Sequence, residues 1–111
     1  MPQAMFVQEG GAVDYTPGSA VAAGDVVVQG ELVGVAKQPI AANALGALAV
    51  AGVFDFAKAT GGGTAITAGA LCYWNDTGNV ATTTASGNKL IGKCVAAAGD
   101  NDATVRVKLT Q

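Results

Sequence analysis

Short runs of strand-forming residues, separated at intervals of about 8–12 residues by turn-forming residues, constrain the fold of this chain most strongly. The clearest run is 103–110, where inward Val105, Val107 and Leu109 alternate with outward Thr104, Arg106 and Lys108. Similar runs occur at 25–28, 32–37, 70–74, 79–84 and 90–97. Helical periodicity is absent, although 41–48 has room for one helical turn. The sequence therefore predicts an all-β fold, a small antiparallel β-barrel or sandwich of short strands.

The segment 41–58, AANALGALAVAGVFDFAK, is the longest apolar part of this pattern. Successive side chains of a strand point to opposite faces, so Phe54, Phe56 and Lys58 are predicted to share one face. Two of the three phenylalanines would then anchor one patch. We expect Ala47–Lys58 to be the central strand of the sheet.

Two glycine-containing segments give more local predictions. Asp25–Val28 and Leu32–Lys37 are expected to form a hairpin with its turn at 29–31. The segment 60–64, TGGGT, is expected to be a flexible loop. It lacks the Gly-Lys-Ser/Thr sequence and the following helix of a phosphate-binding loop, so we do not expect it to bind phosphate.

A chain of 111 residues is long enough for one domain. Residues 1–18 are predicted to form an extended N-terminal arm, and residues 19–111 a single β domain. The arm contains the adjacent hydrophobic residues Met5, Phe6 and Val7. Two placements stay open for it, packing on its own domain or exchange onto a neighbouring subunit.

Charged residues make up only 13% of the chain, about half the usual share, and the net charge is −2. A small domain with so few charges is expected to bury part of its surface in an assembly. Nucleic-acid binding is not expected, because the six cations are scattered and form no basic stripe. The neighbouring Arg106 and Lys108 are interpreted as a solvated strand face. With no secretory signal or membrane-spanning run, the protein is predicted to be soluble and made in the cytoplasm.

The sequence offers no convincing catalytic, cofactor-binding or metal-binding site, and we predict that the protein is not an enzyme. It contains no histidine, the residue best suited to proton transfer near neutral pH. Most of its eight carboxylates fall in predicted turns. Asp100-Asn101-Asp102 lacks the onward glycine and glutamate of a calcium-binding EF-hand loop.

Cys72 and Cys94 are the only cysteines, and both lie in predicted strands. Buried packing is the favoured interpretation, a cross-strand disulfide stays open, and catalysis is disfavoured because no histidine could activate a thiol. Tyr73 and Trp74 should point to opposite faces of one strand, with one of them in the core. We expect Trp74 to be the exposed one, as an interface anchor or as part of a carbohydrate-binding surface.

Several motifs in order give this chain a family resemblance. They are AGDVVV at 23–28, LVGVA at 32–36, Gly46, GVFDF at 52–56, ITAG at 66–69, CYW at 72–74, threonines at 82–84 and LIG at 90–92. The series resembles the capsid decoration, or cement, proteins of tailed bacteriophages over roughly residues 5–109.

The resemblance implies a homotrimer that binds the major capsid protein on the outer surface of the phage head and stabilises contacts between capsomers. Its expected location is the virion, after synthesis in the host cytoplasm. The capsid or trimer interface is expected to include Met5, Phe6, Val7, Tyr15 and Trp74. The alternative hypothesis is a virion-surface binding module for a glycan or a host receptor.

Overall fold

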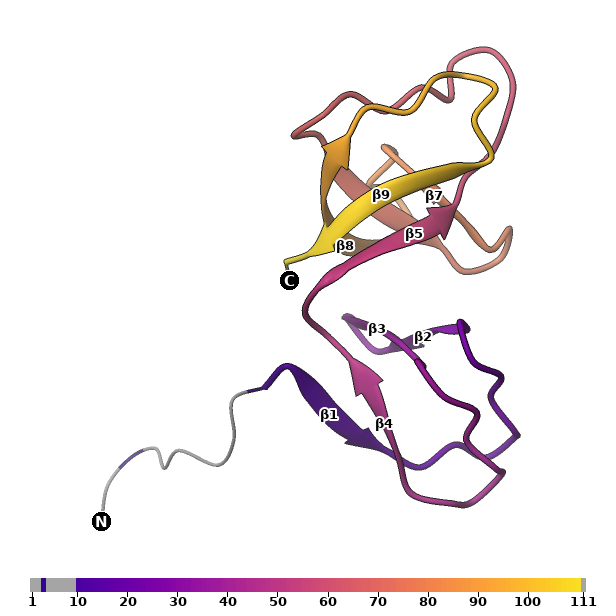
Figure 1. Cartoon of the computed structure of the whole chain (residues 1–111), viewed down its shortest axis with the longest axis vertical. Coiled ribbons are helices and arrows are strands. Elements are labelled where there is room, and N and C mark those ends of the chain that lie inside the picture. The colour runs from indigo at the N-terminus through magenta and orange to yellow at the C-terminus, as the bar shows by residue number, and fades with distance from the viewer. Residues whose placement is uncertain (1–2, 4–9, 111) are drawn as a thin grey trace.

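The structure is a computed structural model that describes residue 3 and residues 10–110. Within this part the chain forms strands and turns with no helix, and the strands make two antiparallel sheets (Figure 1). The predicted all-β fold is therefore confirmed. The strands are β1 (Ala12–Tyr15), β2 (Val26–Gln29), β3 (Leu32–Val35), β4 (Gly46–Ala49), β5 (Val53–Ala57), β6 (Leu71–Asn75), β7 (Val80–Thr82), β8 (Lys89–Ala96) and β9 (Thr104–Leu109).

The first sheet contains four strands in the order β1-β4-β3-β2. The predicted hairpin is confirmed, since β2 pairs with β3 in a register that places Gln29 opposite Leu32 across the turn. Pairing of β1 with β4 runs from Ala12 opposite Ala49 to Tyr15 opposite Gly46. The position of β1 matters for the predicted arm, because residues 12–15 belong to this sheet. The division of the chain at residue 18 stays a prediction.

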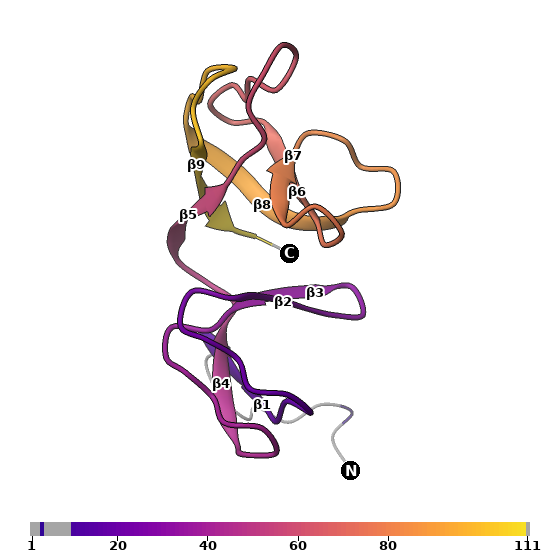
Figure 2. The same ribbon diagram turned by 90° about the vertical axis from the view of Figure 1, so that its right-hand side faces the viewer.

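The β2–β3 hairpin lies between two hydrophobic clusters, and this position explains its unbroken run of valines. Val33 and Val35 are buried in the larger cluster, whose other members come mainly from the second sheet. Val27 packs instead against the smaller cluster of Ala36, Ile40 and Leu48. Figure 2 shows the hairpin lying between the β1–β4 pair and the β5–β9 region. A strand covered on both faces needs apolar residues at consecutive positions rather than at alternate ones.

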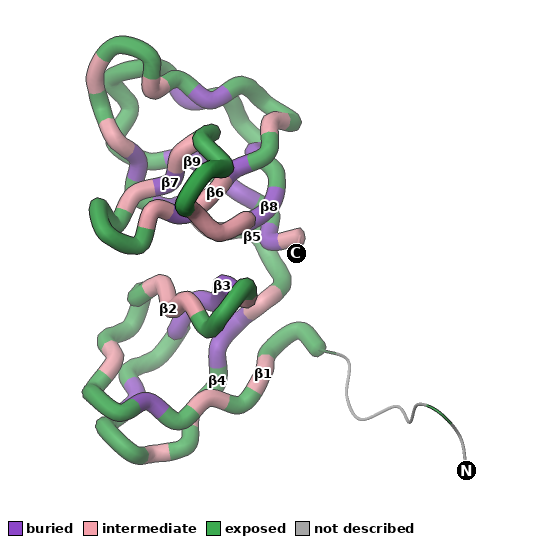
Figure 3. The backbone as a smooth tube through the Cα atoms, turned by 180° about the vertical axis from the view of Figure 1, so that it is seen from behind, coloured by how far each residue is buried: buried purple, intermediate pink, exposed green. Residues whose placement is uncertain are grey.

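The second sheet contains five strands in the order β5-β9-β8-β6-β7. In β9 the burial alternates residue by residue, and Val105, Val107 and Leu109 face the core as predicted. The two edge strands approach each other at the isolated bridge between Lys58 and Ala81, but they do not pair along their length, so the barrel is not closed. Buried positions occur in both sheets (Figure 3).

The predicted central strand Ala47–Lys58 is wrong. Residues 50–52 separate it into β4, in the four-stranded sheet, and β5, at the edge of the five-stranded sheet. Gly52 lies at a φ of 112°, a conformation that residues with a side chain rarely adopt, and this lets the chain turn from one sheet to the other. The face prediction for the second half is confirmed: Phe56 and Lys58 are buried and Phe54 packs against the same core.

Candidate functional site

The exposed side of the five-stranded sheet is the candidate functional surface. Strand alternation turns Phe56, Cys72 and Val107 into the core, so their neighbours along each strand face outward. We call this exposed side the outer sheet face, and it comprises Val53, Asp55, Leu71, Lys93, Val95, Arg106 and Lys108. The described part of the chain exposes four large hydrophobic residues, and three of them, Val53, Leu71 and Val95, lie on this face.

A row of four side chains crosses the outer sheet face from strand to strand. Val53 on β5 lies opposite Lys108 on β9, which lies opposite Lys93 on β8, which in turn lies opposite Leu71 on β6. Val53 is 53% exposed and Leu71 46% exposed. Neither lysine forms an ion pair with any described residue. The row thus presents two adjacent positive charges between two apolar side chains.

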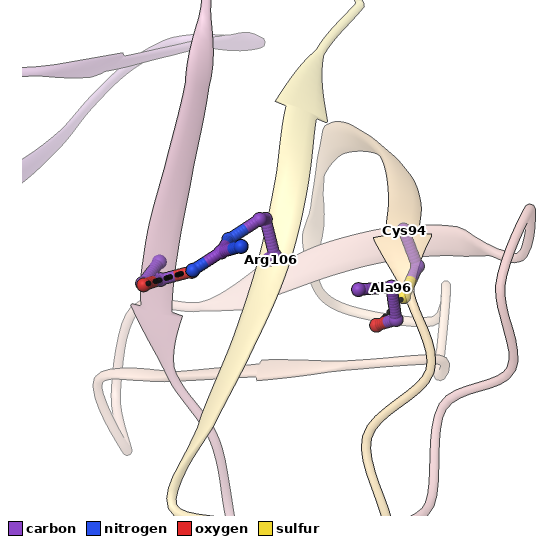
Figure 4. Close-up of polar contacts among 4 residues, drawn as sticks. Cys94, Ala96 and Arg106 are labelled. Atoms are coloured by element: carbon purple, nitrogen blue, oxygen red, sulfur yellow. Dashed lines mark hydrogen bonds and ion pairs between the residues drawn. The ribbon is translucent and has the colours of Figure 1, made fainter.

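Arg106 and Asp55 form the next cross-strand pair on this face (Figure 4). Arg106 donates hydrogen bonds from Nε and Nη2 to the two carboxylate oxygens of Asp55, at 2.9 and 3.2 Å. These hydrogen bonds, and secondarily the guanidinium charge, lower the pKa of Asp55, and Asp55 raises the pKa of Arg106 in the same way. Both groups are therefore charged at neutral pH, and each neutralises the other.

A β-bulge in β8 adds to the apolar part of the face. The register shifts between Cys94, opposite Val107, and Ala96, opposite Arg106, so Val95 is the extra residue. The Cys94 thiol donates to the Ala96 carbonyl oxygen at 3.0 Å, a contact drawn in Figure 4. Because a bulge sets two residues against one on the neighbouring strand, Val95 and Ala96 are both exposed beside Arg106.

The two sheets also enclose a cleft of about 610 Å³. Its apolar lining includes Phe54, Phe56 and Trp74, and its carboxylates are Asp25 and Asp55. Asp55 is bound to Arg106, and no serine, threonine, cysteine or lysine is among the described residues that line the cleft.

The residues predicted for an interface lie in different places. Met5, Phe6 and Val7 lie outside the described residues. Tyr15, on β1, is half-buried and packs against the small cluster of Ala36, Ile40 and Leu48. The structure does not bring Tyr15 to the outer sheet face.

Trp74 and Tyr73 point to opposite sides of β6, but the side chain expected to be exposed is the buried one. Trp74 is 4% exposed, and its ring centroid lies 6.0 Å from that of Phe56. Its indole Nε1 donates to Asp76 Oδ1 at 3.1 Å, which satisfies the polar atom of the ring. Tyr73 is the half-exposed member of the pair. The prediction that Trp74 is exposed is thus wrong, because Cys72 and Trp74 lie on the same side of β6 and this side faces the core.

The two cysteines are free thiols buried in the large hydrophobic cluster, as the packing interpretation predicted. Burial, with a smaller contribution from the neighbouring Cys94, raises the pKa of the Cys72 thiol to about 11. The thiolate needed for nucleophilic or metal chemistry is therefore disfavoured at neutral pH. No described residues form a group of three or more His, Cys, Asp or Glu able to hold a metal ion.

The glycine-rich loop 60–64 is organised around the buried Lys58, a contact that the sequence did not reveal. Lys58 is 4% exposed, and its Nζ donates to Ala59 O, Thr64 Oγ1 and Asp102 O at 2.8, 3.2 and 3.2 Å. An ammonium group has three donors, so this group has none left for a phosphate. The loop has a structural role in this arrangement, because it supplies an acceptor to the buried ammonium group of Lys58.

The two carboxylates of the turn at 99–102 accept hydrogen bonds from nearby backbone amides. Asp100 Oδ1 accepts hydrogen bonds from the amides of Thr64 and Ala65 at 3.1 and 2.9 Å. Asp102 Oδ2 accepts from the amide of Gly99 at 2.8 Å. The Asp100 carboxylate joins this turn to the loop that contains Thr64. The Asp102 carboxylate bonds within its own turn, which is the usual role of Asp in turns. Among the described residues there is also no helix long and apolar enough to cross a membrane.

The fold defines a small all-β protein with two antiparallel sheets, one of which exposes three large hydrophobic residues on its outer face. A family model described as phage cement protein matches residues 7–109, nearly the whole chain. The chain belongs to the phage cement protein family, as the ordered motifs indicated. This is a family of structural phage proteins, which implies a component of the virion capsid rather than an enzyme. Searches of the curated proteins and of the solved structures gave no significant match.

Sequence reasoning missed the outer sheet face as a unit. It paired Arg106 with Lys108 along one strand, and both are exposed as expected. Lys93 joins Lys108 only through the pairing of β8 with β9. The available signal was that Lys93 is the one charged residue in the run 90–97, but its neighbours across the sheet depend on register.

Proposed function

We propose that this protein is a capsid decoration protein that binds the outer surface of a phage head as a homotrimer. It contacts the major capsid protein and stabilises the contacts between neighbouring capsomers. The observation that carries this proposal is the family match over residues 7–109. Synthesis in the host cytoplasm, followed by addition to the assembled shell, is part of the same proposal.

The composition and the surface of the chain support a role in attachment. Charged residues are scarce, and three large hydrophobic residues are exposed on one sheet face. Such surface is favourable to cover with a partner and unfavourable to leave in water. Three linked protomers would convert individually weak contacts into stable binding, because the second and third contacts form within one complex. A closed trimer also follows the general preference of homo-oligomers for closed symmetry.

The test uses undecorated, expanded capsids assembled from the major capsid protein of the phage whose genome carries this chain. Purified protein is mixed with the capsids, and binding is measured by co-sedimentation and capsid disruption by scanning calorimetry. We expect saturable binding and a higher disruption temperature than for capsids alone. An unrelated β protein of similar size is the control. Absence of binding at micromolar concentration would contradict the proposal.

Two further measurements address the trimer and the N-terminal residues. Light scattering after size exclusion should give a mass near three times 10.8 kDa, in solution or after release from capsids. The triple variant Met5→Ala, Phe6→Ala, Val7→Ala should lose capsid binding or trimerisation while it keeps the circular dichroism spectrum of the wild type. Unchanged decoration by this variant would remove these residues from the interface.

The alternative function, a binding module for a glycan or host receptor, depended on an exposed tryptophan. Trp74 is buried and its indole nitrogen is already bound to Asp76. No other observation favours that function, so we do not propose it.

A further inference from the structure

The two lysines at the centre of the outer sheet face form no ion pair with any residue that the structure describes. Lys93 and Lys108 are direct cross-strand neighbours, and like charges in that relation destabilise a sheet. Asp55 lies on the same face, but its two oxygens are bound to Arg106. Among the described residues, no carboxylate forms an ion pair with either lysine. The folded chain therefore keeps an unfavourable charge pair that an acidic partner would relieve.

The residues at both ends of the row favour contact with a protein surface over contact with solvent. Val53 and Leu71 lie beside Lys108 and Lys93 and are about half exposed. Val95, on the bulge two residues beyond Lys93, extends the apolar area. Apolar contacts supply affinity once water is excluded, and the charges select a partner of opposite sign.

The distribution of charge over the chain identifies the sign of the partner. The net charge is −2, from six cations and eight carboxylates. Of the described residues, three cations, Lys93, Arg106 and Lys108, but only one carboxylate, Asp55, lie on the outer sheet face. A second copy bound by the same face around a twofold axis would place lysines against lysines, which is unfavourable. An acidic surface is the complementary occupant, and the capsid is the partner that the proposed function supplies.

We infer that the outer sheet face is the docking surface for the capsid, and that the row Val53–Lys108–Lys93–Leu71 binds a carboxylate-bearing patch of the major capsid protein. This inference rests on the proposed function and adds to it the surface and the chemistry of the partner. Binding through unpaired lysines weakens as salt screens the charges, whereas binding through apolar contacts alone does not.

The test compares Lys93→Glu and Lys108→Glu with Lys37→Glu as a matched control. Lys37 is exposed and follows β3 in the other part of the chain, and its substitution changes the net charge by the same amount. Each glutamate on the outer sheet face is placed opposite the remaining lysine, which favours the folded sheet. The thermal unfolding midpoint should therefore be unchanged or higher, so a loss of binding cannot come from unfolding.

Binding to undecorated expanded capsids is measured by co-sedimentation at about 50, 150 and 500 mM NaCl. The Debye length falls from above about 10 Å to below about 8 Å over this range, so the charges are screened progressively. We expect both outer-face variants to bind at least about tenfold more weakly than the wild type at the lowest salt, and with a smaller salt dependence. The Lys37→Glu variant should bind within about twofold of the wild type, since it lies away from the row.

Each result has a distinct meaning. If the wild type binds capsids and both outer-face variants bind equally well, the docking surface is wrong and the cement function stands. If these variants change the mass measured by light scattering, the face is an interface between copies of this chain and the inferred acidic capsid partner is wrong. If the wild type does not bind capsids at all, the proposed function fails and the inference fails with it.

Discussion

Replacing Phe56 with alanine should remove a large part of the stability of this protein. Phe56 is 3% exposed, and its ring lies 6.4 Å from that of Phe54 and 6.0 Å from that of Trp74, measured between centroids. A buried phenylalanine-to-alanine change costs about 3–5 kcal/mol, and the T-shaped contact with Phe54 and the tilted contact with Trp74 place this site toward the upper end. Small domains have only about 5–15 kcal/mol in total, so the variant should be marginally stable.

The matched control is Phe54→Ala on the same strand. Phe54 is only half-buried and lines the cleft between the sheets, so its replacement should cost about 1–2 kcal/mol. Urea unfolding gives both free energies, with the fluorescence of Trp74, the single tryptophan, as the probe. A loss below about 1 kcal/mol for Phe56→Ala, or equal losses at both positions, would refute the assignment of Phe56 to the core and Phe54 to its margin.

Two other predictions concern the backbone of β8 and the pH dependence of stability. A Cβ at Gly92 would overlap the carbonyl oxygen of Lys108, so Gly92→Ala should force β8 and β9 apart and cost more than about 2 kcal/mol in urea unfolding. Gly62→Ala is the control, because the space around its Cβ position is open. An equally small loss of stability at both positions would contradict the close contact between Gly92 and the backbone of Lys108. Burial raises the pKa of Cys72 from 9.0 to about 11. Between these two pH values the Cys72 thiol keeps its proton in the folded chain and loses it in the unfolded chain. This contribution is complete below about pH 9 and disappears as the pH rises to about 11, so stability should fall less between pH 8 and pH 11 in Cys72→Ala than in the wild type. Identical declines in the two proteins would show that Cys72 does not take part.

The strands themselves could be predicted because their signals are local. Val105, Val107 and Leu109 alternate with polar residues, and this pattern alone specifies a half-buried strand. The β2–β3 hairpin was equally visible, since a β-branched run on each side of a glycine-containing turn favours it. The family also followed from the sequence, because the order of short motifs is a property of the chain and not of its folding.

The candidate site could be predicted only in fragments. The sequence pattern places Arg106 and Lys108 on one exposed strand face. Lys93 and Leu71 join that face only through the pairing of β8 with β9 and of β6 with β8. Trp74 was assigned to the wrong side of its strand. Alternation shows that Tyr73 and Trp74 face apart, but it does not show which side of β6 the rest of the chain covers.

The sequence by itself determined the all-β class, most strand positions and the family of this protein, and it favoured a packing role for the cysteines. Tertiary structure decided that Ala47–Lys58 divides between two sheets and that the β2–β3 hairpin packs against a hydrophobic cluster on each side. It also decided that Lys93 and Lys108 meet with no described carboxylate as a partner. The physical reason is the range of the interactions. Backbone preference and residue alternation act between neighbours along the chain, whereas register and burial depend on strands far apart in sequence.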